Sequence, residues 1–150
     1  MTAKSKTVSI VREQETLYAF EERKKITRSS DSHEILRSHW QDIDDVESFH
    51  VLALSRSNTV IGHKVVSYGG ISGCVADPKI ILRYAITTKG CAGIIVSHNH
   101  PSCNLSASQA DINVTKQLKE ACKALELPLI DHIIITPDNR YFSFADEGML

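Results

Sequence analysis

The hydrophobic positions divide the chain into segments typical of strands and segments typical of helices. Short apolar or alternating runs predict strands, whereas apolar residues three and four positions apart predict amphipathic helices. The strands expected on this basis are 49–54, 60–66, 91–96, 129–135 and 141–144. The helices are expected at about 31–40, 78–89 and 107–125. Segment 91–96 is apolar without alternation, which is typical of a central strand buried on both faces.

Polar residues at the ends of these segments predict where the helices begin. Ser106 is the expected N-cap of the third helix, with Gln109 as its capping-box partner. Asp31 or Ser32 is the expected cap of the first helix. The second helix is expected to open at 77–78, where an aspartate precedes a proline suited to the first helical position.

The order of these elements predicts the fold class. Two strands, a helix, a strand, a helix and two strands give an α/β (α+β) protein with a mixed, largely antiparallel sheet packed by helices. We expect residues 33–150 to form one domain. Residues 1–32 form an N-terminal segment in which Thr7–Val11 could add an edge strand.

Composition narrows the possible partners and compartment. Among the 150 residues, 17 basic and 18 acidic side chains leave a net charge of -1, which gives no long-range attraction for DNA or an anionic membrane. The four cysteines form no Cys-x-x-Cys pair and are expected to be reduced. The N-terminus has no apolar signal-peptide core, and no apolar run is long enough to span a membrane. We therefore expect a cytoplasmic protein.

The candidate chemistry follows the buried run 91–96. His98 and His100 come where the chain is expected to leave the sheet, and Ser108 and Asp111 come in the first turns of the next helix. Two imidazoles and a carboxylate are a donor set that a catalytic zinc takes, with a fourth position left for water. Residues three apart on a helix share a face, so Ser108 and Asp111 are expected on one face near the helix N-terminus, where Asp111 could meet the two histidines.

Simpler interpretations of these residues exist. A His-x-His pair is usually two surface or core histidines, and Ser-x-x-Asp at a helix start is usually a cap. The full pattern His-x-His-x(7)-Ser-x(2)-Asp after an apolar strand is much rarer by chance. The remaining histidines outside segment 129–135 are expected to be exposed bystanders or sheet-surface residues: His33, His39, His50 and His63.

The pattern resembles the JAMM (MPN-plus) metalloproteases, and among them the RadC-like proteins. The family signature matches 98–102, His-Asn-His-Pro-Ser, and 106–111, Ser-Ala-Ser-Gln-Ala-Asp. The resemblance implies a JAB/MPN fold with cytidine-deaminase-like layering over about residues 33–150. It also implies Zn²⁺ as the cofactor, with His98, His100 and Asp111 as its ligands.

The resemblance further implies the two catalytic residues. A glutamate in a Glu-x-Phe context before the first core strand corresponds to Glu47, which would act as general base and acid. Ser108 would donate a hydrogen bond to the oxyanion of the tetrahedral intermediate. Asp44 and Asp45 are acidic neighbours of Glu47, and all three could instead be a polar connection between helix and strand.

Two further positions bear on the site. Asp131 and His132 match an aspartate-histidine pair of the RadC-like pattern, and either orient a zinc ligand or form a buried structural pair. Cys103 stands where the family usually has glycine. A thiolate from Cys103 as fourth ligand would close the site to water.

We therefore expect a zinc-dependent metallopeptidase or isopeptidase acting on a peptide or protein substrate, with no membrane partner. The alternative is a DNA-repair or DNA-associated accessory protein of the RadC type without peptidase activity, although the charge does not indicate DNA. A non-catalytic scaffold would not need the three ligands. A nucleobase deaminase would need His-x-Glu and Pro-Cys-x-x-Cys elements, which are absent. No glycine precedes Gly62, so an upstream helix-hairpin-helix module of longer RadC-like proteins is not expected.

Overall fold

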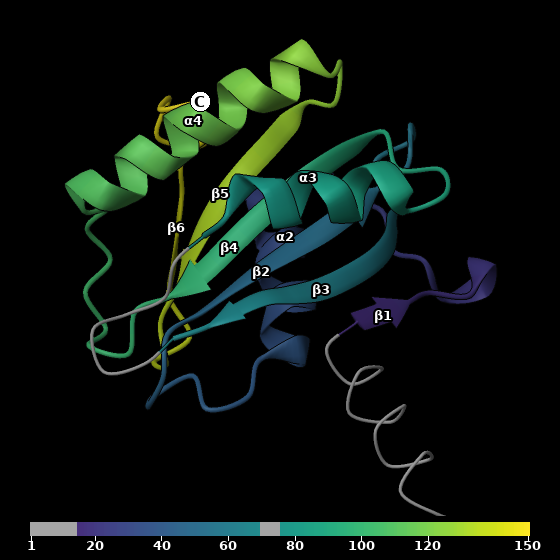
Figure 1. The fold of residues 1–150 in the computed structure, drawn as a ribbon. Helices are drawn as coiled ribbons and strands as arrows, with labels where there is room; N and C mark the ends of the chain where they lie inside the picture. The colour runs from purple at the N-terminus through teal and green to yellow at the C-terminus, as the bar shows by residue number, and fades with distance from the viewer. Residues whose placement is uncertain (1–14, 70–75) are drawn as a thin grey trace, which may run out of the picture.

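One six-stranded sheet organises the protein. The computed structural model describes residues 15–69 and 76–150 (Figure 1). The strand order is β1-β3-β2-β4-β5-β6, and only β4 and β5 are parallel neighbours. The strands are β1 (Glu15–Leu17), β2 (Ser48–Leu54), β3 (Val60–Tyr68), β4 (Gly93–Asn99), β5 (Leu129–Ile135) and β6 (Tyr141–Ser143). The predicted fold class, a mixed and largely antiparallel sheet packed by helices, is confirmed.

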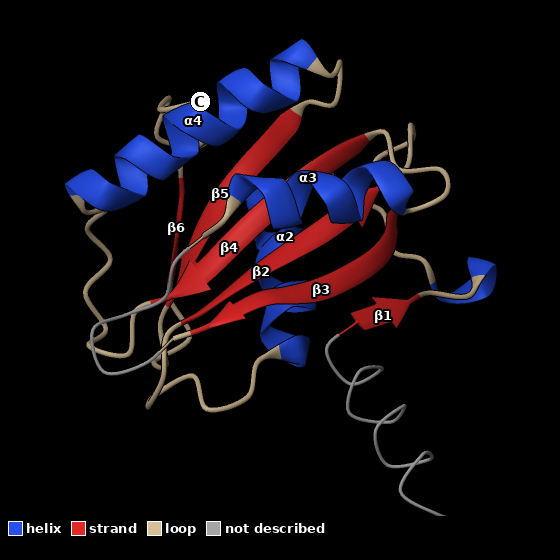
Figure 2. Cartoon of the chain, viewed as in Figure 1, coloured by secondary structure: helices blue, strands red, loops and turns tan. Residues whose placement is uncertain are grey.

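Helices cover both faces of the sheet (Figure 2). Helices α3 (Pro78–Thr87) and α4 (Gln109–Ala124) lie on one face, and α2 (Ser29–His39) lies on the other. A short 3-10 helix, η1 (Phe20–Glu22), follows β1. Because β4 and β5 are parallel, the chain must cross over between them, and α4 makes this crossover.

The alternation of side chains along the central strands gives each face its own core. Toward α3 and α4, Val51 and Ala53 of β2 pack with Val96 of β4. Toward α2, Leu52 of β2 and Ile95 of β4 are fully or almost fully buried. All seven residues of β2 and of β4 are buried, as expected for central strands. The centre of the sheet is therefore closely packed, and one candidate histidine lies near the end of β4 while the other directly follows it.

Two of the three predicted helices, α2 and α4, begin at residues other than those predicted. The third predicted helix is α4, and its N-cap is Ser108, not Ser106, because Ser108 and Asp111 form the capping box. The first predicted helix is α2, which begins at Ser29; Asp31 is its third residue and accepts hydrogen bonds from the preceding backbone. The cap at Asp77 and the proline at the first position of α3 are confirmed.

The prediction that four histidines are exposed or lie on the sheet surface is wrong. His50 and His63 are each only 2% exposed, and His33 is also buried. His39 is half-buried and stacks on His63 with ring centroids 3.9 Å apart. The physical reason is the position of α2, which lies over this face, so that Trp40 stacks on His50 at 3.6 Å. The polar residues that alternate with apolar ones in β2 and β3 therefore also face a packed layer, which α2 forms.

One prediction concerns residues that are not described: the predicted edge strand at Thr7–Val11 lies outside the described residues. Within residues 15–69 and 76–150, no helix combines the length and apolar character needed to cross a membrane.

Candidate metal centre

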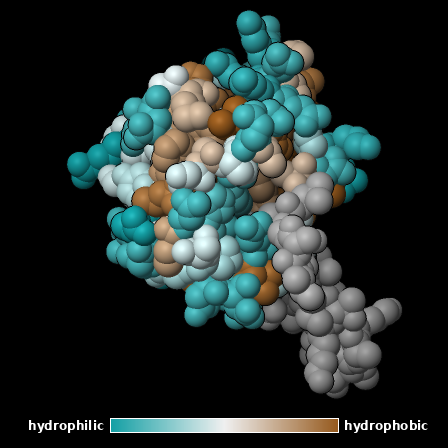
Figure 3. All heavy atoms as spheres, turned by 90° about the vertical axis from the view of Figure 1, so that its left-hand side faces the viewer, coloured by the Kyte–Doolittle hydropathy of each residue, from teal (hydrophilic) through white to brown (hydrophobic). Residues whose placement is uncertain are grey.

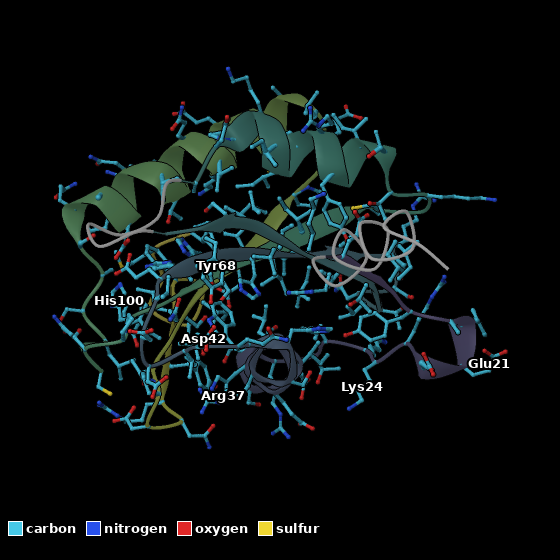
Figure 4. All side chains as sticks on the ribbon, turned by 60° about the horizontal axis from the view of Figure 1, so that its bottom comes forward. Glu21, Lys24, Arg37, Asp42, Tyr68 and His100 are labelled. Carbon is cyan, nitrogen blue, oxygen red and sulfur yellow. The ribbon has the colours of Figure 1, made fainter. Side chains whose placement is uncertain are left out.

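The end of β4 supplies two of the candidate ligands. His98 is still in the strand, paired with Phe49 of β2 on one side and Ile134 of β5 on the other. The prediction that both histidines follow the strand is therefore wrong for His98. His100 comes directly after β4, and its backbone N–H donates to the carbonyl of Ile135 at 2.8 Å. Strand pairing thus fixes the backbone under both imidazoles. Figure 4 labels His100 at the end of the sheet below the start of α4.

The start of α4 supplies the third ligand. The Ser108 N–H donates to Asp111 Oδ2 at 2.8 Å, and the Asp111 N–H donates to Ser108 Oγ at 3.0 Å. This reciprocal pair satisfies two backbone donors that a helix start leaves free. It also holds the Asp111 carboxylate beside the helix N-terminus. The capping interpretation of Ser108 and Asp111 is thus correct, and it is compatible with a role for Asp111 as ligand.

The three side chains converge on one point. Nε2 of His98 lies 3.1 Å from Asp111 Oδ1, and Nε2 of His100 lies 3.4 Å from Asp111 Oδ2. The two Nε2 atoms are 3.0 Å apart. Ligand atoms of all three residues lie within 4.8 Å of one another, so this group could hold a metal ion. It is the only such group within the described ranges, and Cys103 is not part of it.

Hydrogen bonds at the other ring nitrogens favour ligation through Nε2. Nδ1 of His100 lies 2.6 Å from the carbonyl oxygen of Asn104, which can only accept, so Nδ1 carries the hydrogen and Nε2 carries a lone pair. Nδ1 of His98 lies 2.8 Å from Nε2 of the buried His132. A metal-ligating histidine typically makes such a bond through its second nitrogen.

The pKa shifts in this group show that its three side chains favour a positive charge between them. Partial burial opposes ionisation of Asp111, but hydrogen bonds that His100 and His98 donate when protonated at Nε2 lower the pKa of its carboxyl far below the usual range. The hydrogen bond to Asp111 raises the pKa of His100 despite partial burial. In contrast, complete burial lowers the pKa of His132 well below its ordinary value. A carboxylate and two neighbouring imidazoles thus favour a proton or a metal cation between them.

Glu47 lies at the same end of the sheet. It precedes β2 directly, and because Phe49 pairs with His98 in antiparallel register, Glu47 comes opposite His100. Glu47 lines a cleft of about 410 Å³ together with His98 and Asp111. Its negative charge is a further cause of the raised pKa of His100. Asp44 and Asp45, the acidic neighbours, are exposed in the preceding loop.

The floor and wall of this cleft are mixed in character. Phe49 and Val114 contribute apolar surface, and Asn113 and Gln117 contribute amides from the exposed side of α4. Figure 3 views the molecule from the side at which α4 begins, where tan and brown residues lie between hydrophilic, teal borders. The lining of the cleft thus offers both apolar and hydrogen-bonding surface.

Sequence reasoning missed Asn99, which lies between the two candidate ligands. Its Oδ1 accepts from the Ser48 N–H at 2.8 Å, and its Nδ2 donates to the carbonyls of Ile43 and Val46 at 2.8 and 2.9 Å. Asn99 is fully buried and therefore ties the end of β4 to the backbone on both sides of Glu47. The sequence feature that could have indicated its role is an amide side chain, able to make several hydrogen bonds, at a position expected to be buried at the end of the strand.

Sequence reasoning also missed Thr115 and left the role of the 131–132 pair open. The structure separates the two members of the pair. Asp131 accepts from the Ser143 hydroxyl at 2.6 Å and from the Ala145 N–H at 3.0 Å, which is a structural arrangement. His132 contacts His98 through one ring nitrogen and Thr115 Oγ1 at 2.6 Å through the other. Only His132 therefore touches a candidate ligand.

Comparisons with known proteins match this architecture. The profile of the RadC-like JAB domain family matches residues 26–149. A UPF0758 protein of Flavobacterium johnsoniae is 40% identical over 126 residues, which are 84% of this chain and 54% of that protein. A UPF0758 protein of Porphyromonas gingivalis is 38% identical over 128 residues, which are 85% of this chain and 56% of that protein. The chain thus spans about half the length of the curated relatives it matches, and it belongs to the RadC-like JAB domain family.

Proposed function

We propose that this domain is a zinc-dependent hydrolase that cleaves amide bonds of a peptide or protein substrate, either peptide or isopeptide bonds. One observation carries the proposal. Nε2 of His98, Nε2 of His100 and the Asp111 carboxylate converge within 4.8 Å beside a cleft that contains Glu47. Two imidazoles and one carboxylate match the ligand set of zinc hydrolases, which leaves a fourth position for water.

His98, His100 and Asp111 would hold the ion. Zn²⁺ bound there would supply a Lewis acid that lowers the pKa of a water molecule toward about 7 and polarises the scissile carbonyl. Glu47 would take the proton of the attacking water and pass it to the leaving nitrogen. A carboxylate suits both tasks because it can accept a proton in one step and donate it in the next.

Ser108 would assist at the substrate carbonyl. Its Oγ already accepts a hydrogen bond from the Asp111 N–H, which leaves the hydroxyl hydrogen free to donate. The helix start also directs backbone N–H groups toward developing negative charge. Both features support a role for Ser108 as an oxyanion donor.

Metal analysis with two variants tests this function. Purified protein is expected to hold about one zinc per chain and to hydrolyse members of a peptide and isopeptide library in a metal-dependent way. His100→Ala should lose the ion and all turnover. Glu47→Gln should keep the ion and lose about 10²–10⁴ in turnover, the usual contribution of general acid-base catalysis. Protein that binds no zinc, or a Glu47→Gln variant with full activity, contradicts the proposed function or its assignment to Glu47.

A further inference from the structure

A hydrogen-bonded chain connects two of the candidate ligands through two residues that are not themselves in the ligand group. It starts at the backbone carbonyl of Asp111, passes through the Thr115 hydroxyl and the His132 ring, and ends at Nδ1 of His98. The three contacts measure 2.6, 2.6 and 2.8 Å. Thr115 is 2% exposed and His132 is fully buried, so water cannot substitute for any of these partners.

The chemistry of Thr115 fixes the direction of the chain. Its hydroxyl has one hydrogen, and the Asp111 carbonyl can only accept, so a 2.6 Å contact between the two oxygens requires that hydrogen. The second 2.6 Å contact of Thr115 Oγ1 must then receive its hydrogen from Nδ1 of His132. A neutral imidazole has only one N–H, so Nε2 of His132 becomes an acceptor.

Because Nε2 of His132 is an acceptor, it determines which ring nitrogen of His98 carries the hydrogen. Nδ1 of His98 lies 2.8 Å away and must carry the hydrogen of that contact. Nε2 of His98 is then left with a lone pair that faces Asp111 and His100. The opposite direction of the chain would place a hydrogen on this Nε2 and block it as a ligand.

We propose that Thr115 and His132 are positioning residues that hold His98 in the tautomer able to bind a metal ion. The inference rests on the proposed function only in that the cation is taken to be zinc. The side chain of Thr115, one turn after Asp111 on α4, thereby couples the helix that carries one ligand to the strand that carries the other.

Nitrogen NMR of the histidine rings tests the direction of the chain. In the wild-type protein, metal-free and zinc-loaded, His132 is expected to carry its hydrogen on Nδ1, and zinc-loaded His98 is expected to carry its hydrogen on Nδ1 as well. A hydrogen on Nε2 of wild-type His132 overturns the inference. This readout needs no variant, so it holds even if a substitution prevents folding.

Zinc affinity, measured by competition with a chromogenic chelator, tests the consequence. Thr115→Val should weaken zinc binding 10–100-fold and shift the hydrogen of His132 toward Nε2. Thr115→Ser keeps the hydroxyl and should restore both properties. Thr88→Val is the matched control, because the Thr88 hydroxyl makes the same bond to the carbonyl four residues earlier, at 2.6 Å, without a histidine beyond it; its affinity should equal that of wild type.

The outcomes separate this inference from the proposed function. A folded Thr115→Val variant that binds zinc within threefold of wild type, with His132 unchanged, overturns the positioning role and leaves the proposed function standing. Wild-type protein that binds no zinc, while His132 carries its hydrogen on Nδ1, overturns the proposed function and supports the direction of the chain.

Discussion

The two faces of the sheet each carry a cluster of three histidines, and only one cluster is suited to bind a cation. On the face of α4, His98 and His132 are in contact and His100 lies beside them. On the face of α2, His50 Nδ1 lies 2.8 Å from His63 Nε2, and His39 stacks on His63. Buried imidazoles in mutual contact are thus common to both faces.

The difference lies in the partners of the ring nitrogens. His50 uses both nitrogens internally, one with His63 and the other with the Ser48 hydroxyl at 2.9 Å. Trp40 stacks on its ring, and within residues 15–69 and 76–150 no carboxylate hydrogen-bonds to His50 or His63. On the other face, the Asp111 carboxylate and a cleft meet two Nε2 atoms whose partner nitrogens are already satisfied. A carboxylate and free lone pairs, more than the number of histidines, therefore distinguish a candidate metal centre from a packed polar core.

The largest expected contrast comes from one substitution on each face. Asp111→Asn removes the anionic ligand, so zinc binding and metal-dependent hydrolysis should be lost. The weakened helix cap should lower the free energy of unfolding by only about 1 kcal/mol. His63→Leu should keep zinc and activity but lower the free energy of unfolding by about 1–3 kcal/mol, because Nδ1 of His50 is left buried without a partner. Metal analysis and denaturant unfolding measure the two effects.

Either of two results would break this comparison. Zinc lost from His63→Leu at a temperature where the variant is folded would mean that the α2 face takes part in metal binding. Zinc kept at wild-type affinity in Asp111→Asn would mean that the carboxylate is not a ligand.

Acid should act on His50 and His63 in the opposite direction from His100. Burial, with the nearby His39, lowers the pKa of His50 to about 3 and that of His63 to about 2. Both are neutral in the folded protein, whereas the unfolded chain takes up their protons below about pH 6.5. Their contribution to stability is thus complete above about pH 6.5 and is lost as the pH falls toward 3. At about 1.4 kcal/mol per pKa unit, the loss reaches several kcal/mol.

His100 responds with the opposite sign. Its pKa is raised, first by the hydrogen bond to Asp111, so it stabilises the metal-free protein below about pH 6.5 and loses that effect as the pH rises through its folded pKa. Denaturant unfolding of metal-free protein at pH 7 and pH 5 should show a net loss of stability at pH 5. The double variant His50→Gln/His63→Gln should show a smaller loss. Equal losses in both proteins would assign the acid sensitivity to other groups.

The comparison also explains what the sequence could and could not predict. Strands β2 to β6 were predictable because their apolar runs do not depend on distant partners, and β5 begins and ends where expected; the short edge strand β1 was not predicted. His98, His100 and Asp111 were predictable as a group because few patterns place two imidazoles and a carboxylate so close in sequence. Whether the three side chains converge depends on strand pairing and on where the helix begins. The sequence was compatible with this convergence but could not predict it.

The burial of His50 and His63 and the role of Thr115 depend on contacts between distant segments, whereas the shifted helix cap depends on a local pair. His50 and His63 read as surface residues because alternation does not tell which layer covers a face; α2 does so here. Thr115 is one polar residue among many on α4, and its role exists only because His132 comes from a strand 17 residues later. The cap moved from Ser106 to Ser108 because Asp111, two residues beyond Gln109, closes the capping box.

The smallest expected effect concerns the loop between the two ligand-bearing elements. Cys103 has φ of 64°, a left-handed conformation that favours glycine. Cys103→Gly should therefore raise the free energy of unfolding by about 0.5–1 kcal/mol, since relief of the strain outweighs the added freedom of the unfolded chain. Asn139, with φ of 65°, is the matched control, because asparagine tolerates this conformation and Asn139→Gly should gain less.

The zinc affinity of Cys103→Gly tests whether the thiolate of Cys103 is a ligand. Cys103 is not among the residues whose ligand atoms converge, so Cys103→Gly should bind zinc as tightly as wild type. Its carbonyl accepts from Arg140 at 3.0 Å, and this backbone contact survives the substitution, which keeps the loop in place beside His100. A more than tenfold loss of affinity would make the thiolate a fourth ligand, and a site closed in this way would resemble the α2 face in having no position left for water.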